Sequence, residues 1–328
     1  MRLILTLVFI ATLVLVFTTD AVVEQGHAGE FTKSGLNKRK TELTGLLGQR
    51  RVYRYYVPTR YDSERSYPLV IALHGINSRG RNIRLRSGLD DVAERDGFIA
   101  VYPEGNGIGA LFKHWNAGAC CAKAMKKGID DAGFVMRIVD ELSTGLSIDA
   151  SRIYLFGFSN GAMLTYQIAA KYPERIAAIA AVSGTFGRVT ASGELDWYLP
   201  RPAMSVPTLI VHGSDDPRLP FNGVLDTEKR DGLGMIPVKQ SANFWARVND
   251  CPTQPTTPSS GYENVDLMLW SKCESTSEVR LYRLSGWEHS WAGASSKTRS
   301  DYNKVGGFET AEVIWEFFQR FSRSKIFQ

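Results

Sequence analysis

Short runs of apolar residues, each bounded by turn-forming residues, recur along the chain after about residue 50. Most of these runs are continuous rather than alternating, which is typical of strands covered on both faces, as in a parallel sheet. Residues 51–57 alternate instead and predict an edge strand. The continuous runs cover residues 69–73, 98–102, 153–158, 176–182 and 208–212, and residues 279–284 supply a last strand.

Helical patterns lie between these runs, with apolar residues spaced three and four apart. An alternation of strands and helices implies right-handed crossovers and a three-layer α/β sandwich around a mostly parallel, doubly wound sheet. No linker divides the pattern, so residues 50–322 are expected to form a single catalytic domain. The helical faces are formed by Phe134, Val135, Ile138, Val139, Leu142 and Leu146, by Phe244, Trp245 and Val248, and by Ile314, Phe317, Phe318 and Phe321.

The N-terminal residues have the pattern of a secretory signal. Arg2 precedes fifteen residues, 3–17, in which only two threonines interrupt the apolar side chains. Small residues follow, so cleavage is expected after Ala21 or as late as Ala28. An uncleaved anchor is the alternative, because the apolar stretch is only slightly shorter than a bilayer span. Residues 22–49 are polar and basic and are expected to be loosely ordered, and the protein is expected to be extracellular or periplasmic.

The composition is that of an ordinary globular protein, with 44% hydrophobic and 22% charged residues among 328 and a net charge of +5. The basic residues are scattered, apart from concentrations at 33–40 and 79–86. Neither concentration is interleaved with aromatic residues, which favours a solvated surface and no nucleic-acid partner. Contact of the arginines at 79, 81, 84 and 86 with an acidic polymer is the alternative. We expect a monomer with no stable membrane partner once the signal is removed.

Four cysteines agree with an oxidising compartment. Cys251 and Cys273 flank a loop rich in Pro, Thr and Ser, and a bridge between them would close about 23 residues and stabilise the fold by roughly 3 kcal/mol. Four cysteines allow three pairings, however. The adjacent Cys120 and Cys121 could form a strained vicinal disulfide, stay reduced or bridge elsewhere. No histidine lies at ligand spacing from any cysteine, so no metal is expected.

The sequence Gly157-Phe158-Ser159-Asn160-Gly161 joins a predicted strand to a helical segment, 162–171. In this context G-x-S-x-G indicates a nucleophile elbow, a sharp turn that exposes the serine hydroxyl at the start of a helix. Ser159 is therefore the predicted nucleophile.

A serine nucleophile needs a base and an acid that orients it, and on this kind of elbow the chain order is Ser, Asp or Glu, then His. Only His212 and His289 follow Ser159. His212 ends a buried run and is expected to be packed there, whereas His289 lies in a loop after the last strand and is the predicted base. Asp215 and Asp216 both follow the strand at 208–212, and position alone does not choose between them.

Two backbone N–H groups are expected to bind the oxyanion. One belongs to Asn160, directly after the nucleophile, and the other to Ile76 in the loop after the strand at 69–73. Gly75 would let the backbone turn so that the Ile76 N–H faces the serine. His74 is expected to hold this loop without taking part in catalysis.

Together these motifs resemble the secreted esterases of the polyhydroxybutyrate-depolymerase family, which also holds feruloyl and acetylxylan esterases. The resemblance runs from about residue 51 to 320 and implies an α/β-hydrolase fold. It favours Asp216 as the acid, although Asp215 then occupies a position that is usually uncharged, and Ala292 stands where the family has proline. The matching segments are P-L-V-I-A-L-H-G at 68–75, W-N-A-G-A-C-C at 115–121, I-D-D-A-G-F at 129–134, D-A-S-R-I-Y-L-F-G-F-S-N-G-A-M at 149–163, 212–220 and 286–293.

The resemblance implies a secreted serine esterase that hydrolyses short-chain carboxylic esters without a cofactor. Its substrate would be a small or polymer-borne ester, of the polyhydroxybutyrate, feruloyl or acetyl type. Trp291 resembles a substrate-side aromatic, with a packed loop anchor as the alternative. Residues 102–131 form a long loop that is expected to line the pocket and to bring Trp115 to the substrate. The rival hypotheses are a non-catalytic binding protein on a hydrolase scaffold and a serine peptidase.

Overall fold

The computed structural model describes residue 31 and residues 34–44, 50–107, 112–118, 120, 122–190, 192, 194–224, 233–293 and 304–323. The predicted signal segment and both of its cleavage positions lie outside these residues. No helix in the described ranges is long and apolar enough to cross a bilayer.

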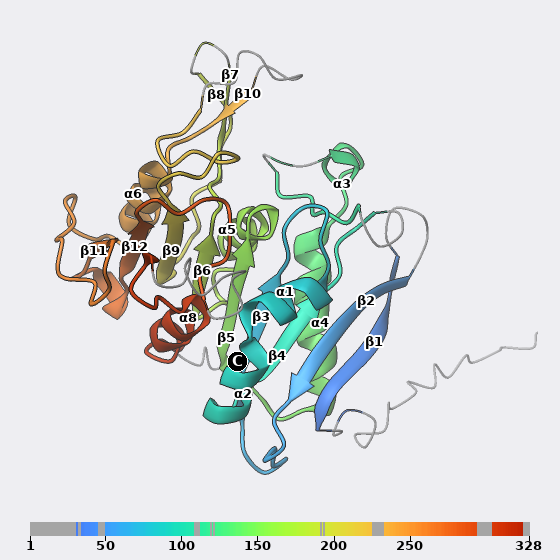
Figure 1. The fold of residues 1–328 in the computed structure, drawn as a ribbon. Helices are drawn as coiled ribbons and strands as arrows, with labels where there is room; N and C mark the ends of the chain where they lie inside the picture. Colours follow the sequence, from blue (N-terminus) through green and yellow to red (C-terminus); the bar gives the residue numbers. More distant parts are fainter. Residues whose placement is uncertain are drawn as a thin grey trace, which may run out of the picture.

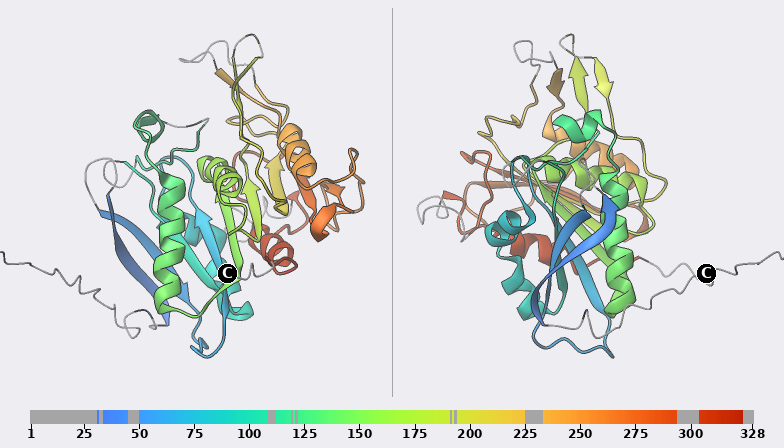
Figure 2. Two further views of the ribbon diagram at one scale, coloured as in Figure 1. Left: turned by 180° about the vertical axis from the view of Figure 1, so that it is seen from behind. Right: turned by 90° about the vertical axis from the view of Figure 1, so that its right-hand side faces the viewer.

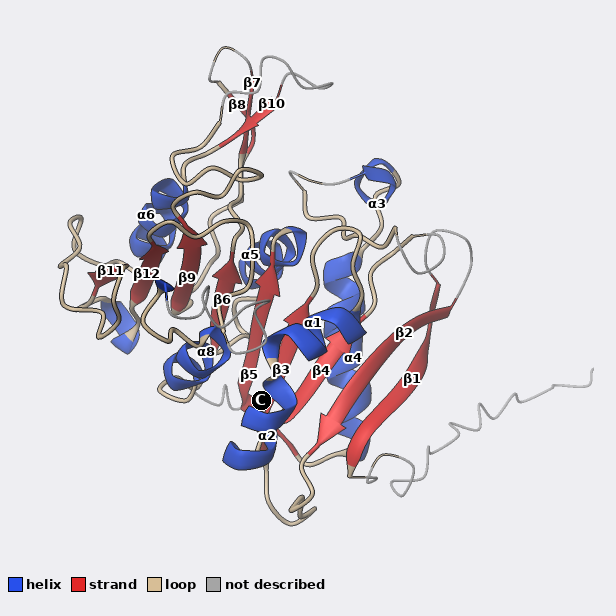
Figure 3. Ribbon diagram, viewed as in Figure 1, coloured by secondary structure: helices blue, strands red, loops and turns tan. Residues whose placement is uncertain are grey.

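A sheet of nine strands forms the centre of the described part of the chain (Figures 1 and 3). The strand order is β1-β2-β4-β3-β5-β6-β9-β12-β11. The six strands from β4 to β12 in this order are parallel, while β1, β2 and β11 each run antiparallel to their neighbours. The strands are β1 (Gly35–Thr44), β2 (Arg50–Val57), β3 (Tyr67–Leu73), β4 (Ile99–Pro103), β5 (Ile148–Phe158), β6 (Ala178–Val182), β9 (Thr208–Gly213), β11 (Val265–Trp270) and β12 (Val279–Leu284).

Helices cover both faces of this sheet, so the predicted three-layer α/β sandwich is confirmed. Helices α1 (Gly80–Ser87), α2 (Leu89–Asp96) and α8 (Thr310–Phe318) lie in front in Figure 1. Helices α4 (Asp131–Gly145), α5 (Asn160–Lys171) and α6 (Val238–Val248) cover the opposite face, seen from behind in Figure 2. The strands are apolar on both faces because each face packs in a separate core. One core takes in the side chains of α4, α5 and α6, and the other takes in those of α1, α2 and α8.

The first strand corrects two expectations. Residues 35–44, expected to be loosely ordered, form β1 and pair with β2 from Gly35↔Val57 to Thr44↔Arg50. The alternating strand at 51–57 is therefore an inner strand, and β1 is the edge. Its half-buried positions include Asn37 and Arg39, so the strand shows no apolar alternation that the sequence could reveal. Backbone pairing with β2 supplies the order instead.

A second, three-stranded sheet stands beyond the carboxyl ends of β6 and β9 (Figure 1). It consists of β7 (Arg188–Thr190), β8 (Leu195–Trp197) and β10 (Leu233–Met235), in the order β10-β7-β8. The short helix α3 (Ala122–Lys126) lies at the same end of the molecule. Each of these strands has three residues, too few for a periodic pattern, and the sequence did not predict them.

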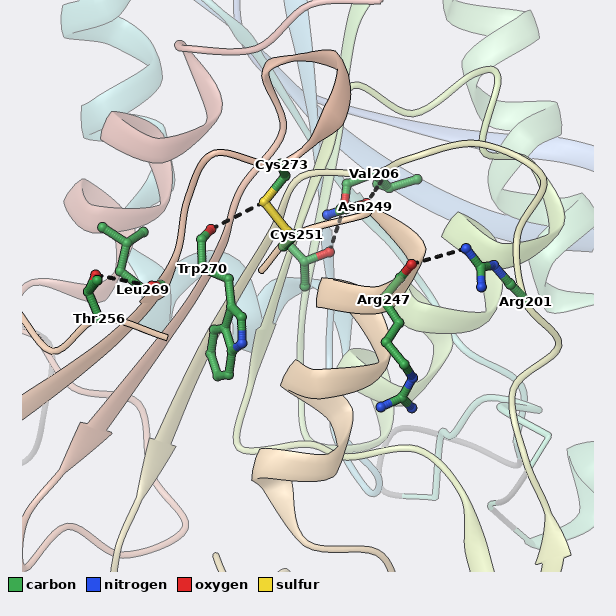
Figure 4. Close-up of a disulfide and its surroundings, with 10 residues drawn as sticks. Arg201, Val206, Arg247, Asn249, Cys251, Thr256, Leu269, Trp270 and Cys273 are labelled. Carbon is green, nitrogen blue, oxygen red and sulfur yellow. Dashed lines mark hydrogen bonds between the residues drawn. A yellow bond between two sulfur atoms is a disulfide. The ribbon is translucent and has the colours of Figure 1, made fainter. Parts of the chain in front are cut away.

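The predicted disulfide between Cys251 and Cys273 is confirmed. It joins the chain just after α6 to the segment between β11 and β12, next to the 3₁₀ turn η2 (Glu274–Thr276) (Figure 4). The side chain of Asn249 lies beside it and binds both backbone groups of Val206, at 2.7 Å to the N–H and 2.9 Å to the carbonyl. The end of α6 is therefore fixed to the sheet by covalent and hydrogen bonds.

Candidate active site

Ser159 sits at a strained turn between β5 and α5. Its φ of 56° and ψ of −122° lie outside the regions that most L residues adopt. The turn is tight enough to require glycine on both sides. A Cβ at Gly157 would overlap with the backbone of Gly161, and a Cβ at Gly161 would overlap with the carbonyl of Leu73. The Ser159 N–H donates to the carbonyl of Val182 at 2.9 Å, which fixes the turn against β6.

The three side chains predicted as nucleophile, base and acid meet at the carboxyl end of the sheet. His289, in the loop after β12, has Nε2 2.9 Å from Ser159 Oγ and Nδ1 2.7 Å from Asp216 Oδ2. The carboxylate can only accept, so Nδ1–H donates to Asp216 and Nε2 is left to accept the serine proton. The His289 side chain is 7% exposed, which limits competition from water for both bonds.

Asp216 and its neighbour Asp215 have different hydrogen-bond partners. Asp216 Oδ1 accepts the N–H groups of Arg218 and Leu219, both at 2.9 Å, while Oδ2 faces His289. Asp215 is exposed and accepts a hydrogen bond from Ser214 instead. Of the two carboxylates that the residue order left open, Asp216 is the one that lies within hydrogen-bond distance of the imidazole.

The Asp216 carboxylate is held in its ionised form. Burial would raise its pKa, but hydrogen bonds from His212, His289 and the Leu219 N–H outweigh burial, so the pKa lies well below its usual range. His212 is fully buried at the end of β9, as expected, and its Nε2 lies 2.8 Å from the Leu219 carbonyl and 3.3 Å from Asp216 Oδ2. The contact of His212 with Asp216 was not predicted from the sequence, although the two residues have i,i+4 spacing across the turn.

The loop after β3 passes directly over the nucleophile. A Cβ added at Gly75 would lie 3.2 Å from the Cβ of Ser159. His74 fixes the loop, because its Nε2 accepts the Gly105 N–H at 2.9 Å and its Nδ1–H donates to the Gly75 carbonyl at 2.7 Å. Burial lowers the pKa of His74 to about 3, so the ring is neutral. Ile76 follows in this loop and is half-buried.

The prediction that Trp115 contacts the substrate is wrong. Its side chain is 0% exposed, so it presents no surface to a substrate. Its indole Nε1–H donates to the His74 carbonyl at 2.7 Å, and the ring lies 4.8 Å from the His74 ring. The backbone N–H of Trp115 donates to Asn160 Oδ1 at 2.7 Å. Trp115 therefore links the long loop after β4 to the loop after β3, through His74, and to the start of α5, through Asn160.

Trp291 is likewise buried, at 3% exposure. Its ring packs 5.5 Å from Phe156 and 6.5 Å from Phe158, between the elbow strand and the His289 loop. These contacts match the loop-anchor alternative rather than a direct substrate contact. Both tryptophans bury their large apolar rings, and this burial stabilises the folded conformation of the loops in which they lie.

A buried ion pair anchors the long loop between β4 and α4. Asp131 accepts from the Asn106 side chain and from the Asn116 N–H, both at 2.7 Å. Arg51 on β2 pairs with the same carboxylate at 2.6 Å, and the two side chains are 4% and 0% exposed. Cys120 in this loop is disulfide-bonded, and Cys121 lies outside the described residues. The pairing of Arg51 with Asp131 was not predicted from the sequence.

A family model described as esterase PHB depolymerase matches residues 51–219, just over half of the chain. The chain belongs to this family. The match takes in β2 to β9 and the elbow with Ser159, and it confirms the resemblance seen in the sequence.

Individual family relatives are similar at low identity. The bifunctional acetylxylan esterase/xylanase XynS20E of Neocallimastix patriciarum is 28% identical over 237 residues, or 72% of this chain and 30% of the relative. Feruloyl esterase B of Piromyces equi is 25% identical over 71% of this chain and 41% of the relative. The chain thus matches less than half of the length of either.

A solved acetyl xylan esterase from Aspergillus awamori has the same fold. It covers 87% of this chain and 99% of its own, with a TM-score of 0.57 and 17% sequence identity. This likeness supports the α/β-hydrolase type of fold for the sandwich described above. Among the described residues, no group of three or more His, Cys, Asp or Glu side chains could hold a metal ion.

Proposed function

We propose that this protein is a serine esterase that hydrolyses short-chain carboxylic esters through Ser159, His289 and Asp216. The single observation that carries the proposal is the continuous hydrogen-bond chain from Ser159 Oγ through both nitrogens of His289 to Asp216. Membership of the esterase PHB depolymerase family supports the ester as the substrate class.

The acylation step follows from the tautomer of His289. Ser159 Oγ attacks the ester carbonyl carbon, and its proton passes to His289 Nε2, 2.9 Å away. The imidazolium that forms is stabilised by the Asp216 carboxylate at Nδ1. His289 then gives its proton to the leaving alcohol, and an acyl group remains on Ser159.

Deacylation repeats these proton transfers with water as the nucleophile. His289 removes a proton from the water as it attacks the acyl carbonyl, and returns that proton to Ser159 Oγ when the acid leaves. Asp216 remains ionised throughout, because its pKa lies far below neutral pH. The second histidine, His212, lies with Nε2 2.8 Å from the Leu219 carbonyl and 3.3 Å from Asp216 Oδ2, so its Nε2–H is directed mainly at the carbonyl and lies close to the same carboxylate.

The oxyanion is held by the backbone N–H groups of Ile76 and Asn160. Asn160 is the first residue of α5, where the helix dipole also favours negative charge. Gly75 brings the Ile76 loop against Ser159. Loss of one such donor typically costs about 10²–10³ in turnover.

We place the substrate among short acyl or hydroxyacyl esters, either small or attached to a polymer. An exported protein that acts outside the cytoplasm as a monomer agrees with the N-terminal sequence and with the disulfide. Residues 1–21 would be the signal and 50–322 the catalytic domain.

Hydrolysis of p-nitrophenyl acetate and butyrate by the mature protein tests the proposal. Ser159→Ala should lower kcat/KM at least about 10³-fold, while Ser290→Ala, an exposed serine beside His289, should retain activity. A peptide p-nitroanilide provides the comparison with a peptidase. Absence of hydrolysis by the wild type would favour the binding-protein hypothesis, and faster cleavage of the anilide would favour a peptidase.

A further inference from the structure

A second histidine lies against the acid of the proposed triad. His212 is near the end of β9, four residues before Asp216, and its side chain is 0% exposed. Its Nε2 lies 2.8 Å from the Leu219 carbonyl oxygen and 3.3 Å from Asp216 Oδ2. A ring with no exposed surface does not reach a substrate, so His212 takes no direct part in the proton transfers assigned to His289.

The surroundings of the His212 ring select one tautomer. A carbonyl oxygen can only accept, so the contact with Leu219 requires a hydrogen on Nε2. Nδ1 is buried and has no hydrogen-bond partner in the part of the chain that the structure describes. A hydrogen on Nδ1 would be buried without an acceptor, whereas the hydrogen on Nε2 faces two oxygens. His212 is therefore a donor at Nε2.

Leu219 links this donor to the carboxylate of the triad. Its N–H donates to Asp216 Oδ1 at 2.9 Å, and its carbonyl accepts from His212. The Arg218 N–H also donates to Oδ1, at 2.9 Å. Because two donors occupy Oδ1, Oδ2 is left for the imidazole of His289, at 2.7 Å. The turn that begins at Asp216 thus closes on its own carboxylate, and His212 holds the end of that turn against β9.

The beginning of the same turn is held by the loop that carries the base. The Asp215 N–H donates to the Trp287 carbonyl at 3.0 Å, and the Gly286 N–H donates to Ser214 Oγ at 2.8 Å. These bonds constrain the residues just before Asp216 relative to the His289 loop. The bond from His212 to Leu219 constrains the residues that follow Asp216, so the carboxylate is held from both sides.

Filling of the core is the competing role for His212. Its ring packs edge-to-face against Phe221 at 6.1 Å, a contact that an apolar side chain could also make. A residue that only fills space can be replaced by an apolar side chain of similar volume with little loss. A donor cannot, because the Leu219 carbonyl would lose its partner. The two roles therefore differ in which replacement preserves activity.

We propose that His212 is a positioning residue for the reaction at Ser159. Its Nε2–H fixes the Leu219 carbonyl, and Leu219 in turn holds the Asp216 carboxylate with Oδ2 directed at His289. The effect on turnover rests on the proposed esterase function, whereas the geometry of Asp216 and His289 can be measured without a substrate.

Two replacements of similar length separate the two roles. Glutamine can place an amide N–H near the position of the imidazole Nε2, and methionine has no donor there. His212→Met should lower kcat for p-nitrophenyl acetate about 10–100-fold and leave KM within about twofold, because misplacement of a catalytic group by about 1 Å can cost 10²-fold. His212→Gln should regain most of that loss. Equal kcat in the two variants, or a faster methionine variant, would overturn the proposal.

Two further variants complete the series. His212→Asn keeps an amide but places it one atom short of the Leu219 carbonyl, so its kcat should be as low as that of His212→Met, and it replaces that variant if the methionine protein does not fold. Asp215→Asn changes an exposed side chain of the same turn and is the matched control, with the kcat of the wild type. An asparagine variant as active as the glutamine variant would contradict the proposal.

Proton NMR measures the acid–base pair without chemistry. The Nδ1–H of His289 donates to a buried carboxylate and should give a resolved downfield resonance, identified by its loss in His289→Gln. This resonance should persist in His212→Gln and be broadened or lost in His212→Met at the same pH. An unchanged resonance in His212→Met would contradict the proposal. If the wild type hydrolyses no ester, the proposed function fails, while the NMR comparison still decides whether His212 positions Asp216.

Discussion

The carboxamide of Asn160 binds both backbone groups of Trp115: its Oδ1 accepts the N–H at 2.7 Å and its Nδ2 donates to the carbonyl at 3.3 Å. Trp115 in turn donates through its indole to the carbonyl of His74, one residue before Gly75. The two chain segments proposed to bind the oxyanion are thus joined through one buried tryptophan. Asn160 has a positioning role through its side chain, in addition to the role proposed for its backbone N–H.

Replacement of Asn160 should therefore impair turnover more than binding. Asn160→Ala leaves the Trp115 N–H buried and unpaired, which should lower the free energy of unfolding by about 1–3 kcal/mol and kcat by at least about tenfold. Asn160→Asp keeps the acceptor but puts negative charge beside the oxyanion, so kcat should fall while more of the stability remains. Urea unfolding and ester kinetics measure both effects. Equal kcat in both variants and the wild type would contradict the positioning role.

His74 should make stability depend on pH. Its pKa is about 3 in the folded protein against an ordinary 6.5, so below pH 6.5 the unfolded chain takes up a proton that the native ring refuses. The contribution of a neutral His74 is complete above pH 6.5 and decreases as pH falls from 6.5 toward 3. The slope from this group approaches about 1.4 kcal/mol per pH unit.

Thermal unfolding at a series of pH values measures this slope. His74→Gln does not titrate, so the variant should show a flatter decline of Tm between pH 6.5 and 5 than the wild type. Parallel curves would show that His74 is not the group responsible.

The buried pair of Arg51 and Asp131 should show strong coupling. Arg51→Met and Asp131→Asn each remove one partner and leave the other as a buried charge without a counter-ion. Each change should lower the free energy of unfolding by about 3–5 kcal/mol. The double variant should recover part of that loss. Denaturant unfolding of all four proteins gives the coupling energy, and strictly additive effects would contradict a direct pair.

The disulfide between Cys251 and Cys273 should affect stability without affecting chemistry. It closes a loop with a sequence separation of 22 residues, far from Ser159 in the chain, so replacement of both cysteines by alanine should cost roughly 3 kcal/mol. At 25 °C the kcat of the folded variant should match that of the wild type. Differential scanning calorimetry and ester kinetics check the two statements, and a loss of kcat in the fully folded variant would count against this account.

The central sheet could be predicted from the sequence, because strands of a parallel sheet that are buried on both faces consist of continuous apolar runs. The elbow could be predicted as well, since Gly157 and Gly161 are required by close backbone contacts that no other residue allows. Strand β1 was missed because its order comes from pairing with β2 rather than from its own side chains. Strands β7, β8 and β10 were missed because three residues are too few to show an alternation of apolar and polar side chains.

The roles of the two tryptophans could not be read from sequence. A tryptophan near a motif can contact a substrate or fill a core, and only the surrounding atoms decide which. Trp115 and Trp291 are both buried. The pairing of Arg51 with Asp131 likewise depends on segments brought together from different parts of the chain.

Covalent labelling of Ser159 tests the central proposal most directly. The protein would be mixed with p-nitrophenyl acetate, quenched in acid within its first turnovers, digested and analysed by mass spectrometry. We expect an acetyl group on the peptide that contains Ser159, in step with a burst of p-nitrophenol, and no acetylated peptide from Ser159→Ala. Acetylation at another residue, or undiminished hydrolysis by Ser159→Ala, would contradict the account.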